Sequence, residues 1–315
     1  MAEILLSLTI IGVVAAITLP SLTGNINERT WNTQRKALYA RFSQAIALMP
    51  NLNGYGTLSN AVEADADAGI AAEDAVDTAA ETFVTDGLAK VMKINNICDS
   101  EHLIDCGMPQ TVIDLQGNVI SNFTTSYDTL SKYNTLFTSA TGIPIDTKAA
   151  AFETQNGESI MVYYNPNCVG DLEETFQYYI QPKMCANFIY DLNGSKGPNT
   201  MGKDIGFIST LYPSDSVIVA PLPLTTNATG TNAVSQTEAG TLCKNQDSES
   251  RLPNRDEMAA MFYNMKLVGI STANYWSSSV VSSGDVGKGW VQYFDTGYRT
   301  PFSRSFGFLV RCVKR

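Results

Sequence analysis

Histidine is nearly absent from this sequence, and basic residues are outnumbered by acidic ones. The 315 residues include a single histidine, His102, and 21 Lys or Arg against 31 Asp or Glu, which gives a net charge of −10. One imidazole excludes a histidine-rich metal site and leaves at most one histidine as a general base. The acidic balance argues against a specific nucleic-acid partner, because phosphate binding needs clustered Lys and Arg. At roughly 100–200 residues per domain, the length suits about two domains.

Charge is also absent from one long stretch near the start of the chain. Residues 4–22 are nineteen residues without a charge, near the length that crosses a bilayer as a helix. A signal peptide is the alternative, but no basic region precedes the run. An amphipathic helical pattern instead continues over residues 25–49, with apolar residues at three- and four-residue spacing: Trp31, Leu38, Phe42, Ala45, Ile46 and Met49. The pattern predicts one helix as far as Pro50, roughly 75 Å long.

Three residues mark this helix. Glu3 precedes the apolar run, Gly12 opens a patch of small residues, and Pro20 lies inside the run. With the amphipathic continuation, they resemble the N-terminus of type IV pilins and pseudopilins. A plain single-pass membrane anchor is the alternative, but an anchor needs no amphipathic continuation.

The resemblance to pilins implies a life cycle and a set of partners. A prepilin peptidase cleaves a leader, the new N-terminus is methylated, and the helix holds the subunit in the inner membrane. Pilus assembly machinery then builds copies of the subunit into an extracellular helical filament on the bacterial surface. The resemblance further implies that Glu3 neutralises the N-terminal amine of a neighbouring copy, with Gly12 and Pro20 in the assembly helix. The family usually has a few more residues before this Glu, so the sequence does not place the mature N-terminus.

The six cysteines are even in number and follow an export-type segment, which favours disulfides. Six cysteines allow fifteen connectivities. Proximity along the chain favours sequential pairing: Cys98–Cys106, Cys168–Cys185 and Cys243–Cys312. Zinc is the alternative, but the sequence has no C-x₂-C pair and a single histidine.

The middle of the chain is acidic and then rich in strand signals. Residues 63–86 carry eight acids and no Lys or Arg, which favours a helix with a solvated acidic face. Residues 111–120 predict a hairpin around Gly117, and residues 158–166 a strand. Asp191, Asn193 and Asp204 place oxygen atoms around a Gly-rich turn, like half of a calcium loop. The alternative is a plain turn in which Asp191 and Asn193 make Asx-type bonds.

Residues 233–315 read as a second unit. From Arg251 onward there are nine Lys or Arg and four Asp or Glu, so this end is basic. Asn254 and Glu257 form a capping-box pattern, and aromatic-rich runs predict short strands over 273–279, 288–300 and 306–315. The set around Cys243, Arg251-Leu252-Pro253, Tyr275-Trp276-Ser277-Ser278, Trp290 and Val310-Arg311-Cys312-Val313 resembles the C-type-lectin-like module of Legionella collagen-like adhesins and of related surface proteins, a fold shared with formylglycine-generating enzymes. The aromatics mostly suit a core, although with Arg299 and Arg304 they also suit a face for a glycan or host-surface ligand.

These patterns predict an α+β protein in four parts. A transmembrane and polymerisation helix spans 1–50, a pilin head with an antiparallel sheet 51–220, a linker 221–232 and a lectin-like surface domain 233–315. The expected function is that of a structural subunit of a type IV pilus-like filament. A minor tip adhesin and a type II secretion pseudopilin are the alternatives. We expect no enzyme activity, because no Ser/His/Asp set, phosphate loop or metal cluster is present in the sequence, and no cofactor other than the calcium alternative.

Overall fold

The computed structural model describes residues 29–49, 79–122, 149–164, 183–212, 216–219, 222–223, 233–246, 248, 250–264, 270–281 and 287–314. Within these ranges the chain has α-helices and antiparallel sheets, so the predicted α+β class is confirmed. The largest sheet has six antiparallel strands in the order β1-β4-β5-β6-β7-β8. Their bounds are Ile94–Cys98, Ala150–Thr154, Ser159–Tyr164, Lys183–Asp191, Ile205–Tyr212 and Ser216–Val219.

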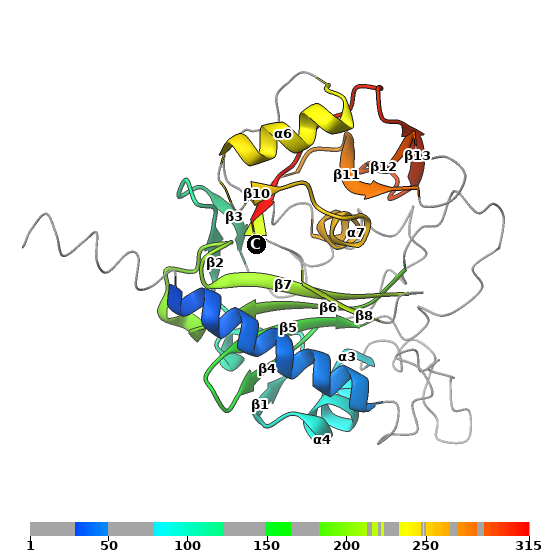
Figure 1. Ribbon diagram of the computed structural model, residues 1–315. Coiled ribbons are helices and arrows are strands. Elements are labelled where there is room, and N and C mark those ends of the chain that lie inside the picture. Colours follow the sequence, from blue (N-terminus) through cyan, green and yellow to red (C-terminus); the bar gives the residue numbers. More distant parts are fainter. Residues whose placement is uncertain are drawn as a thin grey trace, which may run out of the picture.

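The amphipathic helix predicted before Pro50 is present over residues 29–49, as the blue helix of Figure 1. It lies across one face of the six-stranded sheet and buries its apolar stripe there, with Leu38 and Phe42 fully buried. The Phe42 ring lies 4.7 Å from that of Phe188 on β6 and 6.4 Å from that of Phe152 on β4. The apolar residues that recur with the helical period of 3.6 therefore form the face of the helix that contacts the sheet.

A short helical segment covers the same face of the sheet beside helix 29–49. It consists of α3 (Ala79–Thr82), the π-helix η1 (Phe83–Leu88) and α4 (Ala89–Val91). Phe83 stacks on Tyr164 of β5 at 4.2 Å, which anchors the segment to the sheet. The predicted acidic helix is thus confirmed over its described end, residues 79–86, with a π turn that its composition did not indicate.

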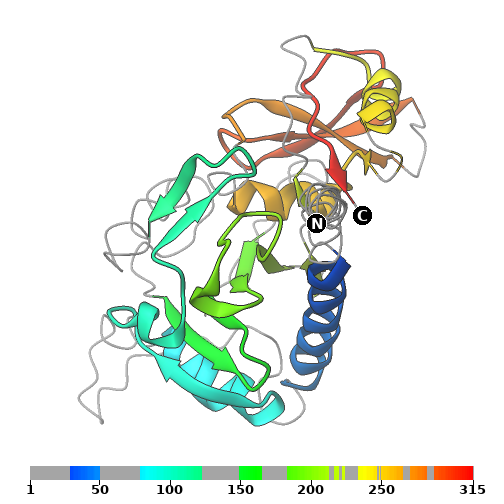
Figure 2. The same cartoon turned by 90° about the vertical axis from the view of Figure 1, so that its left-hand side faces the viewer.

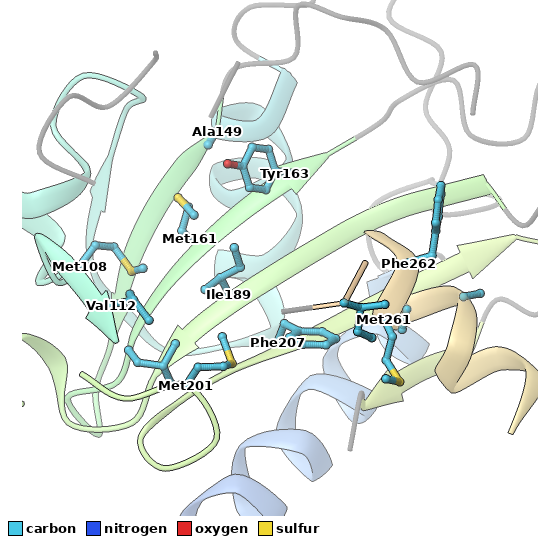
Figure 3. Close-up of a cluster of buried hydrophobic side chains, with 14 of the residues drawn as sticks. Met108, Val112, Ala149, Met161, Tyr163, Ile189, Met201, Phe207, Met261 and Phe262 are labelled. Carbon is cyan, nitrogen blue, oxygen red and sulfur yellow. The ribbon is translucent and has the colours of Figure 1, made fainter. Parts of the chain in front are cut away.

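The opposite face of the sheet is covered by elements from the C-terminal part of the chain. Helix α7 (Arg255–Tyr263) begins at Asn254, where the predicted capping box with Glu257 is present. Met258 to Phe262 share one buried cluster with Met161, Ile189 and Phe207 of the sheet, as Figure 3 shows for part of it. Asn264, at the end of α7, bonds to Asn187 of β6 at 2.9 Å, and Ser209 of β7 donates to the same Asn187 at 2.6 Å. Residues of the predicted head and of the predicted surface domain therefore share one core.

The remaining C-terminal elements form a smaller body beyond α7. Helix α6 (Gln236–Gln246) packs beside the three-stranded sheet β11 (Asn274–Val280), β12 (Lys288–Tyr293) and β13 (Arg299–Ser303). Trp276 is fully buried here, and its indole N–H donates to the carbonyl of Val234 at 2.8 Å. Figure 2 shows α6 and β11–β13 gathered at one end of the molecule, clear of helix 29–49.

Two small sheets complete the described structure. Strand β14 (Val313–Lys314) lies between β10 (Ser250–Arg251) and β9 (Leu222–Pro223). Residues 306–315 are predicted as a short strand, but within this stretch the described chain forms a strand only at Val313–Lys314 and isolated bridges at Phe308 and Leu309. β9 lies at the start of the predicted linker 221–232, so this part of the linker pairs with strand β14.

The other small sheet is the predicted hairpin, formed by β2 (Thr111–Ile113) and β3 (Val119–Asn122). Asp114 closes its turn by accepting the backbone N–H groups of Gln116 and Asn118. Gly117 has a positive φ of 88°, which a glycine adopts without strain. A short 3-10 helix, η2 (Leu103–Cys106), precedes this hairpin.

Candidate functional site

The predicted assembly residues Glu3, Gly12 and Pro20 lie outside the described residues, as does the charge-free run 4–22. Among the helices that are described, none is both long and apolar enough to cross a membrane. The structure describes helix 29–49, which follows this run in the sequence, and its contacts with the six-stranded sheet.

Helix 29–49 is held to the sheet by two arginines as well as by its apolar stripe. Arg41 reaches the turn between β4 and β5, where it forms a two-pronged ion pair with Glu158, which is 6% exposed. The hydroxyl of Thr154 donates to the same carboxylate. Arg35 reaches the loop between β6 and β7 and donates to the backbone carbonyl of Lys203 at 2.7 Å. Both contacts hold the helix to loops at one end of the sheet.

The disulfides that the structure describes agree with sequential pairing. Cys98 bonds to Cys106, and Cys243 bonds to Cys312. Cys185 is disulfide-bonded too, and Cys168, its predicted partner, lies outside the described residues. The Cys243–Cys312 bond joins α6 to the residue before β14 across a sequence separation of 69, so it cross-links the C-terminal body.

The three predicted calcium ligands lie on the loop between β6 and β7 or at its edge: Asp191, Asn193 and Asp204. Asp191 ends β6 and Asp204 precedes β7, and both are fully buried. The two carboxylate oxygens of Asp204 accept the backbone N–H groups of Thr200 and Asn199, each at 2.8 Å. One Asp191 oxygen accepts the N–H of Asn193 at 3.0 Å, which is the Asx-type bond of the plain-turn alternative.

The second oxygen of Asp191 is buried and has no hydrogen-bond partner in the described part of the chain. Burial raises the pKa of Asp191 to about 7, and the negative charge of Asp204 adds to this rise. Backbone bonds, the largest from Asn193, oppose the rise without cancelling it. A carboxyl group with this environment binds a proton near neutral pH unless a cation compensates its charge.

Asn199 joins this group of oxygens, although the sequence did not single it out. It has a positive φ of 53° and follows the cis Gly197–Pro198 bond, and its side-chain oxygen is buried without a partner in the described chain. The side-chain oxygen of Asn193 is in the same state, while its NH₂ group donates to the carbonyl of Gly197 at 2.7 Å. Asn tolerates a positive φ better than most residues do. An Asn after Gly-Pro is therefore the sequence feature that could have pointed to Asn199.

The aromatic residues of the C-terminal body divide between core and surface. Tyr275, Trp276 and Phe294 are buried, as expected of a core. Tyr298 and Phe306 are exposed, at 44% and 57%. Among the described aromatic residues of this body, these two are the most accessible to a ligand.

Of the two arginines predicted to line a binding face, Arg299 departs from that expectation, and Arg304 is half-buried. Arg299 is buried and donates to Asp256 at 3.3 Å, so it serves the interior of the C-terminal body. Arg255 instead presents a cation on this body, with its guanidinium 4.9 Å from the centre of the Trp290 ring. Such a contact is a cation–π interaction.

Features of an enzyme site are scarce in the described ranges. They contain no cluster of three or more His, Cys, Asp or Glu side chains placed to hold a metal ion. His102 lies on the surface within the Cys98–Cys106 loop, where its ring nitrogen contacts Asp99 at 2.7 Å. The hydrogen bond that the protonated ring donates to the Asp99 carboxylate raises the pKa of His102. Comparison with known proteins yields no relative, since neither a protein-family model nor a curated protein matches this chain.

Proposed function

We propose that this chain is a structural subunit of an extracellular, type IV pilus-like helical filament. The observation that carries the proposal is the packing of helix 29–49 on an antiparallel sheet, in a chain whose sequence has nineteen uncharged residues, 4–22, before this helix. In the proposed filament, copies bundle their uncharged runs into a shaft, and helix 29–49 fixes the head of each copy beside it.

The exposed side of helix 29–49 supports the same function. Ala37, Ala40 and Ala47 are exposed there, and Leu48 is 48% exposed. Small side chains permit close approach between helices, and an exposed Leu gains by burial against a neighbour. The arginine contacts at Glu158 and Lys203 lie on the sheet side and leave this outer side open.

The C-terminal part supports an adhesive role within the filament. Helix α7 and the elements beyond it lie on the face of the sheet opposite helix 29–49. In a filament whose axis is formed by the helices, these elements face outward. The exposed Tyr298 and Phe306 then lie where a glycan or a host-surface ligand can meet them.

Replacing Glu3 tests the filament function. Glu3→Ala removes the carboxylate that would neutralise the N-terminal amine of a neighbour, whose burial unpaired is costly. We expect loss of filaments sheared from cells while the membrane-held subunit is present in normal amount on immunoblots. Glu81→Ala, at an exposed position of α3, is the matched control and should assemble normally. Normal filament yield with Glu3→Ala would contradict the proposal.

The second candidate, a minor adhesin at the filament tip, is favoured by the same outward C-terminal body. Immunogold labelling with an antibody against residues 233–315 separates the two. Label along the filament length supports the shaft subunit, and label confined to the ends supports the tip adhesin. Filaments without label would contradict both.

A further inference from the structure

The loop between β6 and β7 contains an excess of buried oxygen atoms. Asp191 and Asp204 are both fully buried, which is costly for carboxylates without a compensating charge. Three oxygen atoms of the loop are buried without a hydrogen-bond partner among the described residues: those of Asp191 (Oδ2), Asn193 (Oδ1) and Asn199 (Oδ1). Buried polar atoms nearly always have a partner, so three orphans of the same type in one loop call for one.

The missing partner is positive, and the described chain does not supply it. Every orphan is an acceptor, so a donor or a cation is required. The two lysines of the loop, Lys196 and Lys203, are exposed and form no ion pair with Asp191 or Asp204 in the described structure. Arg35 approaches the loop but donates to the backbone carbonyl of Lys203. Backbone N–H groups bond to both oxygens of Asp204 but to only one oxygen of Asp191, and no cation among the described residues pairs with either carboxylate.

The loop also holds these oxygens in fixed positions. Asn193 is oriented by the bond from its NH₂ group to the carbonyl of Gly197 at 2.7 Å, which leaves its oxygen free. The bonds from the N–H groups of Asn199 and Thr200 fix Asp204 at the far end of the loop. Pre-positioned oxygens lower the ordering cost of binding an ion.

We propose that this loop binds one calcium ion through Asp191, Asn193, Asn199 and Asp204. Calcium takes six to eight oxygen ligands from carboxylates, amide oxygens, backbone carbonyls and water, in a flexible geometry. Two carboxylates and two amide oxygens match that preference, and their charge balances the ion. Magnesium suits the loop less, because it demands near-ideal octahedral geometry and usually keeps several waters.

Binding here bears on the attachment of helix 29–49. The loop that holds the ion is the same loop whose carbonyls at Gly202 and Lys203 accept from Arg35. An ion that orders residues 191–204 therefore also fixes one of the two arginine contacts of the helix. The proposal concerns the folded chain and is independent of filament assembly, so either can fail alone.

The test is calcium titration of the purified full chain after removal of divalent ions. We expect isothermal titration calorimetry to show one calcium per chain, and thermal unfolding to shift upward by several degrees in millimolar calcium. Magnesium at the same concentration should give a much smaller shift. An absence of binding by the wild type, or an equal response to magnesium, would overturn the proposal.

Matched variants localise the ion. Asp191→Asn keeps the shape of the side chain and removes its charge, and should weaken binding at least tenfold. Asp114→Asn is the control, because Asp114 closes a similar turn but is exposed, with both oxygens bonded. It should bind as the wild type does. Wild-type affinity in Asp191→Asn, or equal loss in Asp114→Asn, would refute the site.

A variant that adds a ligand charge covers the case in which Asp191→Asn does not fold. Asn193→Asp adds a carboxylate, and ligand charge tunes calcium affinity. We expect several-fold tighter binding. An unchanged or weaker dissociation constant in a folded Asn193→Asp protein would contradict the assignment.

Discussion

The attachment of helix 29–49 to the sheet can be tested with one pair of leucines. Leu38 and Leu48 lie on the same helix, ten residues apart, but Leu38 is fully buried and Leu48 is 48% exposed. The same substitution to Ala at the two positions removes the same atoms from different environments. Helix propensity changes little and equally, because Leu and Ala are both strong helix formers.

Leu38→Ala should destabilise the protein far more than Leu48→Ala. Truncating a buried Leu loses its transfer free energy and leaves a cavity, at a cost of about 3–5 kcal/mol. Exposed substitutions away from special features usually change stability by no more than about 0.5 kcal/mol. For a domain of roughly 150–250 residues, 3 kcal/mol corresponds to a drop of about 6–12 °C in Tm.

The assay is thermal and urea unfolding of the full chain in mild detergent, followed by near-UV circular dichroism. The aromatic contacts of Phe42 with Phe152 and Phe188 make the near-UV signal sensitive to this interface. Equal effects of Leu38→Ala and Leu48→Ala would refute the packing of the helix on the sheet. A large effect of Leu48→Ala alone would place the other face of the helix against the protein.

Three other features of the fold can be tested by substitution: a buried hydrogen bond, a buried carboxyl group and a disulfide. Asn264→Ala leaves the NH₂ group of Asn187 unpaired between α7 and the sheet, and should cost about 1–3 kcal/mol in urea unfolding. With divalent ions chelated, protonated Asp191 stabilises the folded chain below pH 4, and this contribution is lost as the pH rises through the folded pKa of about 7. The difference in unfolding free energy between wild type and Asp191→Asn should therefore change by on the order of 4 kcal/mol over that pH range and then level off. Replacing both Cys243 and Cys312 by Ser opens a loop with a sequence separation of 69 and should cost about 4 kcal/mol by the chain-entropy model, measured against wild type under oxidising conditions.

Local patterns predicted much of the fold. The apolar stripe of helix 29–49, the capping box at Asn254 and the hairpin turn around Gly117 each depend on fewer than twenty-five consecutive residues. Such signals depend on backbone geometry and on periodicity, which the sequence shows directly. The stretch 306–315 shows the limit, because its aromatic pattern suited a strand, whereas its residues serve mainly as bridges and core contacts.

Long-range polar contacts escaped prediction. Arg41 and Glu158 are 117 residues apart, and Asn187 and Asn264 are 77 residues apart. Neither pair has a local sequence pattern. The sequence around a charged or amide side chain does not show whether its partner is water or a residue on a distant strand. In the loop between β6 and β7, the Asp and Gly spacing indicates a turn rich in oxygen atoms, but only the packing of the loop leaves the side-chain oxygen of Asn199 buried without a partner among the described residues.

The most direct test of the filament account is imaging of purified extracellular filaments to subunit resolution. We expect residues 4–22 of many copies to form the axial bundle, and helix 29–49 to lie nearer the filament axis than the sheet does. We also expect α6 and β11–β13 to lie on the outer surface. A filament with the C-terminal body at its axis, or one in which this chain is absent, would contradict the account.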